Sequence, residues 1–407
     1  MSTSEPQKRF LILTGDAGFG HRSAARSVAA ALKAQHPGSA EVHIINPVTE
    51  RPAPSFLRQT QVNYDQTVLK NPDWYRFTYS ISNNRAVSSL VESGLTLMLF
   101  RNMQRLLAEF EPHAILTTIN LFNAPMGSVL HLLQKPIPFF TVVTDLADVH
   151  RLWFQASPDR IFVATEAVRE QALQTGIAAH AHKVNVSGIP VDPRLAEPAD
   201  QEEKAQLRLS FDLQPDLPTL LFVGSWRVAG IYECLEALQG CSHPVQVLLA
   251  AGGDEALCRR ISAQTWNFPL HYENYVKDLP VWLRAADVLV TKAGGLILSE
   301  GLAAGLPLVL INNLPGQEDG NVRFITENRA GVRVQNEMEF LTVIEAWLID
   351  RGVALNEMTT QARVLGHPSA AFTIADALWQ ATLVNPPQPQ PSIPQSLFRM
   401  HPHARVG

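Results

Sequence analysis

Short apolar runs alternate with longer amphipathic segments along most of this chain. The run 10–14 has the length of a buried strand, and the alanine-rich segment 23–32 that follows has helical spacing. A second run of this kind is found at 41–45. The alternation continues through 114–118, 125–133, 137–143, 160–164, 166–174 and 184–186. Strands that alternate with helices are typical of an α/β protein with a parallel sheet.

The same alternation begins again in the second half of the chain. Pro193, Pro198 and the charged segment 200–204 interrupt it, and the apolar run 219–223 restarts it. A chain of 407 residues is also long for one domain. We predict an N-terminal domain of residues 1–197, a C-terminal domain of residues 198–368 and a proline-rich, extended tail of residues 385–407.

One stretch, residues 287–321, combines a strand, a glycine turn, a helix and a polar loop. Lys292 ends the strand, and Gly294 and Gly295 stand before the helical pattern. A glycine turn of this kind presents unpaired N–H groups and a positive dipole end, which suit a phosphate. Glu300 lies early enough in the helix to reach an adjoining ribose. The loop at the same sheet edge contains Gln317, Glu318 and Asn321. Together these features predict a sugar-nucleotide pocket.

A second glycine loop follows the first predicted strand, at residues 15–21. Its spacing differs from the dinucleotide fingerprint G-x-G-x-x-G, because Gly18 and Gly20 are followed at once by His21. Gly20 permits a close approach of the backbone to a ligand. Two interpretations of His21 are open: a solvent-facing histidine at the start of a helix, or a base that activates or orients a substrate.

Polar residues also stand at the end of the predicted strand 137–143. Thr144 and Asp145 follow it directly, and the carboxyl edge of a parallel sheet is where such residues face a cleft. His150 and Trp153 come shortly afterwards. A Thr-Asp pair after a strand is also common as a helix cap, so a structural role is the alternative for Asp145 and His150.

Composition and charge narrow the class of protein. Hydrophobic residues make up 46% and charged residues 17%, as in soluble globular proteins. No apolar run is long enough to predict a membrane-spanning helix, and the polar N-terminus predicts no signal peptide. The three cysteines match no metal motif. A small basic excess in residues 1–195 suits an anionic membrane surface and is too small to predict nucleic-acid binding.

The stretch 287–321 resembles the donor site of family 28 glycosyltransferases. This resemblance rests on Ser299-Glu300, the Gly-Leu-Pro after it, and Gly316-Gln317-Glu318 followed by Asn321. The family includes the peptidoglycan N-acetylglucosaminyl transferase and the diacylglycerol galactosyl- and glucosyltransferases.

Two N-terminal motifs favour the diacylglycerol branch of that family. The order Thr-Asp, His and Trp-Phe over residues 144–154 resembles the monogalactosyldiacylglycerol synthases of plants, and so does the loop Gly-x-Gly-His at 18–21. The resemblance implies the GT-B architecture, in which two Rossmann-like domains face a central cleft. It also implies that residues 369–384 form a helix crossing back to the first domain.

The resemblance assigns roles to individual residues. His21 is the implied catalytic base, with Asp145 as an alternative base or orienting partner, and His150 and Trp153 are acceptor-binding. The backbone near Val276 is implied to read the nucleobase. The segment 224–227 departs from the family, which has more glycine there, so Arg227 either neutralises phosphate charge or blocks the loop. The implied donor-binding residues are Gly20, Gly224, Arg227, Val276, Lys292, Gly294, Gly295, Ser299, Glu300, Gln317, Glu318 and Asn321.

The implied activity is inverting transfer of a hexose, galactose or glucose, from a UDP-sugar to diacylglycerol. No D-x-D motif occurs, so we expect no metal and no other cofactor. Helix dipoles and N–H groups near Gly294 and Gly295 would stabilise the leaving UDP instead. Alternatives are a UDP-N-acetylglucosamine-dependent transferase on another lipid, a UDP-sugar 2-epimerase, and a sugar-nucleotide-binding protein without catalysis. This chain lacks the dense set of acidic residues that a 2-epimerase would need around the donor sugar.

Two segments suggest contact with a membrane. Residues 71–79 are rich in Trp and Tyr, and residues 87–110 have the pattern of a long amphipathic helix. A packed loop and a core helix are the alternative. The expected location is the cytoplasm, at the inner face of a membrane.

Overall fold

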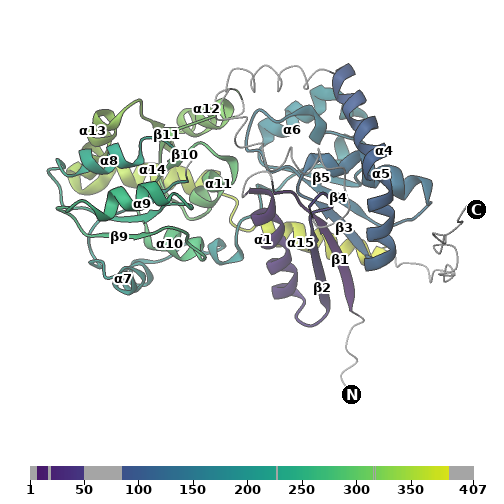
Figure 1. Ribbon diagram of the computed structural model, residues 1–407, viewed down its shortest axis with the longest axis horizontal. Coiled ribbons are helices and arrows are strands. Elements are labelled where there is room, and N and C mark those ends of the chain that lie inside the picture. Colours follow the sequence, from purple (N-terminus) through teal and green to yellow (C-terminus); the bar gives the residue numbers. More distant parts are fainter. Residues whose placement is uncertain are drawn as a thin grey trace, which may run out of the picture.

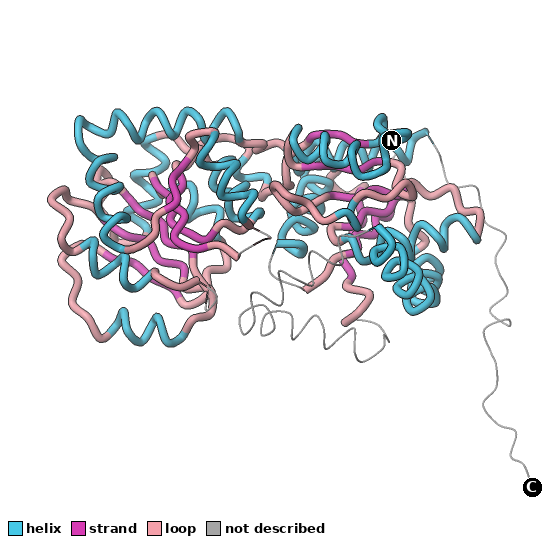
Figure 2. The backbone as a smooth tube through the Cα atoms, turned by 90° about the horizontal axis from the view of Figure 1, so that it is seen from above, coloured by secondary structure: helices cyan, strands magenta, loops and turns pink. Residues whose placement is uncertain are grey.

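The computed structural model describes residues 7–16, 20–49, 85–225, 228–314, 316 and 318–384. They form two α/β domains that lie side by side (Figure 1). Figure 2 shows the strands of each domain as a separate group enclosed by helices. Five predicted features lie outside the described residues: Gly18 in the N-terminal glycine loop, the aromatic segment 71–79, Arg227 with its neighbour Trp226, Gln317, and the proline-rich tail.

The first domain contains a six-stranded parallel sheet in the order β2-β1-β3-β4-β5-β6. Its strands are β1 (Lys8–Leu13), β2 (Ala40–Ile45), β3 (Ala114–Thr117), β4 (Phe139–Val142), β5 (Arg160–Val163) and β6 (Val184–Val186). Its helices are α1 (Gly20–Gln35), α4 (Arg85–Phe110), α5 (Asn123–Leu132), α6 (Glu166–Ala172) and the C-terminal α15 (Ala370–Val384). The central strands are almost wholly apolar because helices cover both faces of the sheet.

The second domain repeats this plan, with the strand order β12-β11-β10-β7-β8-β9, all parallel. Its strands are β7 (Thr219–Val223), β8 (Gln246–Ala250), β9 (Leu270–Glu273), β10 (Val288–Lys292), β11 (Leu308–Asn312) and β12 (Gly331–Arg333). Its helices are α7 (Gln201–Ser210), α8 (Ile231–Leu238), α9 (Glu255–Ser262), α10 (Leu279–Ala285), α11 (Gly295–Ala303), α12 (Asp319–Glu327), α13 (Glu337–Leu348) and α14 (Val353–Leu365).

Helix α15 completes the first domain from the far end of the sequence (Figure 1). It packs against α1 and β3, and its Ile374 and Leu378 join the same buried cluster as Phe10 of β1. Its Trp379 ring stacks on His36, with ring centroids 3.5 Å apart. The chain therefore passes between the domains twice, and the first domain is completed by residues from the C-terminal end of the chain.

Helix α4 is a core helix over most of its length. Its inward residues are Leu95, Leu99, Met103, Leu106 and Leu107, all buried. Leu90 and Leu97, which also belong to the predicted apolar pattern, are 75% and 82% exposed. The helix thus has an outer surface that carries two leucines near its N-terminal end. Among the described helices, none is both long and apolar enough to span a bilayer.

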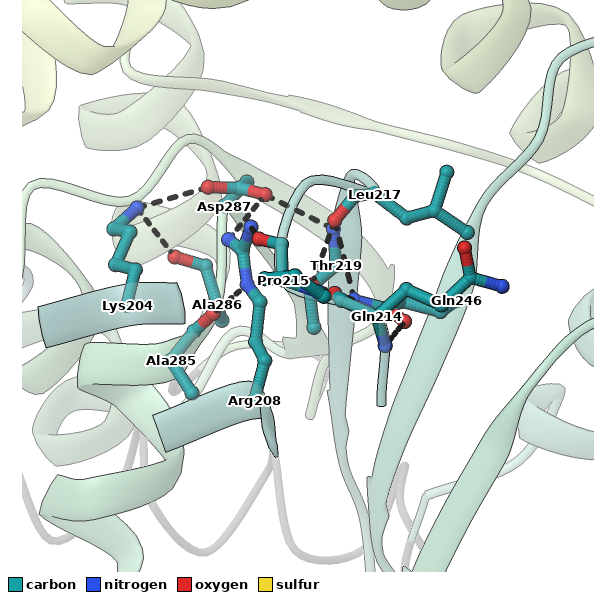
Figure 3. A network of polar contacts seen from close by, with 10 residues as sticks. All are labelled: Lys204, Arg208, Gln214, Pro215, Leu217, Thr219, Gln246, Ala285, Ala286 and Asp287. Atoms are coloured by element: carbon teal, nitrogen blue, oxygen red, sulfur yellow. Dashed lines mark hydrogen bonds and ion pairs between the residues drawn. The ribbon is translucent and has the colours of Figure 1, made fainter. Parts of the chain in front are cut away.

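A partly buried ion cluster anchors α7 to the second sheet (Figure 3). Asp287, just before β10, pairs with Lys204 at 2.9 Å and with Arg208 at 2.7 Å, and accepts a hydrogen bond from the Thr219 N–H. Arg208 is only 3% exposed and also donates to the carbonyl oxygens of Ala285 and Pro215. Removing one member of the cluster would leave the charge of its partner uncompensated, and this would destabilise the fold.

We therefore expect Asp287→Ala to lower the free energy of unfolding of the second domain by about 3 to 5 kcal/mol, because it leaves Arg208 buried without its carboxylate. Urea unfolding followed by tryptophan fluorescence measures the change. The control is Arg259→Ala, which removes an exposed ion pair with Glu255 and should cost less than about 1 kcal/mol. Equal shifts for the two variants would contradict the proposed role of the cluster.

Candidate active site

The N-terminal ends of two helices meet where the domains face each other. Gly20 begins α1 in the first domain, and Gly295 begins α11 in the second. A Cβ atom on Gly20 would lie 3.6 Å from the Leu296 Cβ, so the two helix starts are in contact distance. The positive ends of both helix dipoles therefore point into one region, which favours an anionic ligand there.

His21 is the first side chain beyond Gly20 and is held in one orientation. Its Nδ1 lies 2.8 Å from the Thr118 carbonyl oxygen and 2.8 Å from the Thr144 Oγ1. A carbonyl oxygen can only accept a hydrogen bond, so the contact with Thr118 places the imidazole proton on Nδ1. This tautomer leaves the Nε2 lone pair available to take a proton from a substrate.

His21 and Asp145, which were predicted as base and as alternative base or orienting partner, lie close enough in the structure for each to affect the pKa of the other. Burial lowers the pKa of His21, while the Asp145 carboxylate and the Thr118 carbonyl act in the opposite direction. Burial also raises the pKa of Asp145, although His21 and a hydrogen bond from Trp153 favour its charged form. Glu318 raises the pKa of Asp145 further. The imidazole is therefore kept neutral, as a general base requires.

The two predicted acceptor-binding residues have structural contacts. Trp153 is 1% exposed, and its Nε1–H donates to the Asp145 Oδ2 at 2.8 Å. His150 is buried, caps the short helical turn Arg151–Trp153, and accepts a hydrogen bond from the Leu152 N–H at 3.2 Å. Burial lowers the pKa of His150 to about 4. Both residues thus shape the loop that carries Asp145, and their direct contact with an acceptor stays a prediction.

The glycine turn of the second domain carries a cation beside the start of α11. The Lys292 Nζ pairs with the Glu318 carboxylate, which also accepts from the Leu314 N–H at 2.8 Å. A Cβ atom on Gly294 would lie 3.2 Å from the Lys292 Nζ. A lysine ammonium is unfavourable next to the positive end of a helix unless an anion lies there. Lys292 thus stands beside the start of α11 with its charge paired to Glu318, and the role of Lys292, Gly294 and Gly295 as a diphosphate site stays a prediction.

Farther along α11, Ser299 and Glu300 are both buried. The Ser299 hydroxyl donates to the Gly295 carbonyl within the helix, at 2.9 Å, so it supports the first turn. Burial, with a contribution from Asp192, raises the pKa of Glu300 to about 8. This environment favours the protonated form of Glu300 at neutral pH, and its role as a ribose ligand stays a prediction.

Two further predicted donor-binding residues lie at the same edge of the second sheet. Gly224 follows β7, and a Cβ atom there would lie 2.3 Å from the Ile231 Cδ1, so a larger residue would displace Ile231. Gly252, after β8, packs on the Gly224 carbonyl with a φ of +61°. Val276 lies half-buried in the loop between β9 and α10. Their contact with a nucleotide stays a prediction. The described residues include no group of His, Cys, Asp or Glu that could hold a metal.

The sequence does not indicate what joins the two domains at this site. Asn321, predicted to bind the donor, donates to the Ala293 carbonyl and accepts from the Ala147 N–H. Asp148 forms an ion pair with Arg323. Thr118, whose carbonyl oxygen fixes the His21 tautomer, stands out in the sequence only as a strand end. No local pattern gives these contacts, because each partner comes from a distant part of the chain.

Comparison with known proteins agrees with the predicted resemblance. Residues 21–191 match the family described as monogalactosyldiacylglycerol (MGDG) synthase. The chain is 29% identical to a probable chloroplastic MGDG synthase of Nicotiana tabacum over 91% of this chain and 70% of the relative. It is 27% identical to the chloroplastic MGDG synthase 2 of Arabidopsis thaliana over 91% of this chain and 80% of the relative. The predicted similarity to these enzymes is therefore confirmed.

Solved structures confirm the predicted GT-B fold. Acinetobacter baumannii MurG superposes with a TM-score of 0.57 at 16% identity, covering 92% of this chain and all of that one. Medicago truncatula UGT71G1, complexed with UDP-glucose, gives a TM-score of 0.54 at 12% identity, covering 91% of this chain and 98% of that one. At these identities the similarity concerns the fold alone.

We expect Asp145→Asn to lower the pKa of His21, because it removes the carboxylate that favours the imidazolium. In the wild type, His21 should titrate below the ordinary value of about 6.5, since burial opposes its charged form. NMR pH titration of the histidine rings, with His21→Gln used for assignment, measures both values. Asp376→Asn, an exposed change on α15, should leave the His21 pKa unaltered. A rise in the His21 pKa in Asp145→Asn would contradict the proposed coupling.

Proposed function

We propose that this relative of the MGDG synthases is a UDP-sugar-dependent glycosyltransferase that makes a glycolipid from diacylglycerol. The family match and the names of the relatives support this activity. The observation in the structure that carries it is the placement of the His21–Asp145 pair against the start of α11. A base on one domain thus faces an anion-binding turn on the other, as direct sugar transfer requires.

Each step of the reaction falls to a named group. The Nε2 of neutral His21 takes the proton of the acceptor hydroxyl as the oxygen attacks the anomeric carbon. The bond between the anomeric carbon and the diphosphate oxygen breaks, and that oxygen leaves as part of UDP. The α11 N–H groups and Lys292 stabilise the diphosphate of the leaving UDP. Asp145 stabilises the imidazolium that forms on His21. A single displacement inverts the anomeric configuration.

A bound metal is not needed in this scheme. Lys292 and the first turn of α11 supply positive charge at the place where a divalent ion would otherwise neutralise the diphosphate. The transferred hexose is galactose or glucose, and the names of the relatives favour galactose. Glu318 is the described side chain best placed to hold the sugar hydroxyls, since its carboxylate lies beside Lys292.

We also propose that the protein works at the cytoplasmic surface of a membrane. The acceptor is a lipid, and the exposed Leu90 and Leu97 of α4 lie on the same outer surface as the exposed Arg101 and Arg105. Leucines next to arginines suit an interface of apolar chains and anionic headgroups. The first domain, which carries the candidate base, also carries this surface.

A radiolabelled transfer assay tests the activity. UDP-galactose, UDP-glucose and UDP-N-acetylglucosamine are offered separately, with diacylglycerol in anionic mixed micelles. We expect a lipid product from one hexose donor, unchanged by EDTA and reduced by about 10²- to 10⁴-fold in His21→Ala. A product only from UDP-N-acetylglucosamine would favour the alternative transferase. UDP binding without any transfer, or conversion of the free UDP-sugar, would overturn the proposed reaction.

Vesicle flotation tests the proposed membrane surface. Replacing both Leu90 and Leu97 with serine should reduce binding to anionic phosphatidylglycerol vesicles by at least about tenfold, because two apolar side chains no longer insert. Met338→Ser, on α13 of the second domain, removes another exposed apolar side chain and should have no effect. Equal binding of all three proteins would place the membrane contact elsewhere on the molecule.

A further inference from the structure

The loop after β4, residues 144–148, lies in contact with the first turns of two helices of the other domain. A Cβ atom on Gly295 of α11 would lie 3.2 Å from the Thr144 carbonyl oxygen and 3.3 Å from the Leu146 nitrogen. A Cβ atom on Gly320 of α12 would lie 2.4 Å from the Asp148 Oδ2. Both helices therefore have glycine where the loop of the first domain comes closest.

The side chain of Asn321 connects the two domains at this place. Its Oδ1 accepts from the Ala147 N–H at 3.0 Å, and its Nδ2 donates to the Ala293 carbonyl at 2.8 Å. Asn321 is 4% exposed, so both bonds are shielded from water. Only an amide offers an acceptor and a donor at these two ends, because aspartate lacks the donor and would meet the Ala293 oxygen with a second oxygen.

A second contact between the domains lies beside the Asn321 hydrogen bonds, at the exposed rim of the interface. Asp148 adopts a left-handed backbone conformation, with a φ of +52°, which costs energy for a residue other than glycine. Its carboxylate pairs with Arg323, one turn along α12 from Gly320. The loop conformation is therefore coupled to docking against the second domain.

We propose that Asn321 is a positioning residue that clasps the domains and fixes the base relative to the donor turn. This inference rests on the proposed glycosyl transfer. Asp145 lies two residues before Ala147 and acts on His21, while Ala293 directly precedes Gly294 of the turn. Asn321 thus sets the separation between the group that takes the proton and the group that holds the diphosphate. A small error in such a separation costs a large factor in rate.

If Asn321 positions the two domains, its loss should lower kcat and leave UDP affinity almost unchanged. The two groups proposed to stabilise the diphosphate, Lys292 and the first turn of α11, both belong to the second domain, so the loss of the Asn321 bridge should leave UDP affinity within about twofold. Two shielded hydrogen bonds are lost in Asn321→Ala, so kcat should fall by about ten- to a hundredfold. Asp148→Ala, at the exposed rim, should reduce kcat in the same direction and by less, because an exposed ion pair contributes little.

The experiment compares Asn321→Ala, Asn321→Asp and Asp148→Ala with the control Glu327→Ala, an exposed change on the same helix. Calorimetry measures UDP affinity, small-angle X-ray scattering measures domain separation, and the transfer assay measures kcat. We expect both Asn321 variants to bind UDP normally, to give a more open scattering profile and to turn over slowly, and the control to match the wild type.

Two results would overturn the clasp. A loss of UDP affinity above about tenfold with an unchanged scattering profile would make Asn321 a donor ligand instead. Wild-type scattering together with wild-type kcat in Asn321→Ala would show that the bridge positions nothing. If the wild type itself transfers no sugar, the proposed function fails, while scattering still tests the clasp. If Asn321→Ala does not fold, Asp148→Ala supplies the same test from the rim.

Discussion

The site depends on one imidazole and one carboxylate that are both half-buried at the junction of two domains. Burial alone would keep both His21 and Asp145 neutral, and their mutual attraction opposes it. This balance holds only while loop 144–148 remains packed against the second domain, because the loop carries Asp145 and the Thr144 hydroxyl that contacts His21. His21 and Asp145 both belong to the first domain, and the second domain contributes to their surroundings through Gly295, which packs on the loop, and through Glu318, which raises the pKa of Asp145.

The second domain adds positive charge at the same junction. The start of α11 points its N–H groups at the junction, and Lys292 stands beside it, held by Glu318. The ammonium is paired with a carboxylate, which offsets its repulsion from the helix dipole. A diphosphate would satisfy the lysine and the helix at once, so the arrangement is most favourable when the donor is bound.

Sequence periodicity predicted the two sheets and the strand–turn–helix unit around Gly294 well, because local spacing determines them. The helix predicted to follow the Gly294–Gly295 turn is observed as Gly295–Ala303. The hydrogen bond between Asn321 and Ala147 could not be predicted from the sequence, because the two residues are 174 positions apart and only tertiary packing brings them together. Trp153 lies in the core of the first domain and donates a hydrogen bond to Asp145, while its contact with the acceptor stays a prediction. Burial of this kind cannot be derived from a motif.

The anomeric configuration of the lipid product tests the central claim most directly. A single base on one domain, facing a diphosphate held by the other, permits one displacement and no covalent sugar intermediate. NMR of the glycolipid formed from a UDP-α-hexose should show the β-anomer, and only while His21 is intact. An α-linked product would mean retention of configuration, which a single in-line displacement cannot give, and would contradict the proposed roles of His21, Asp145 and the start of α11.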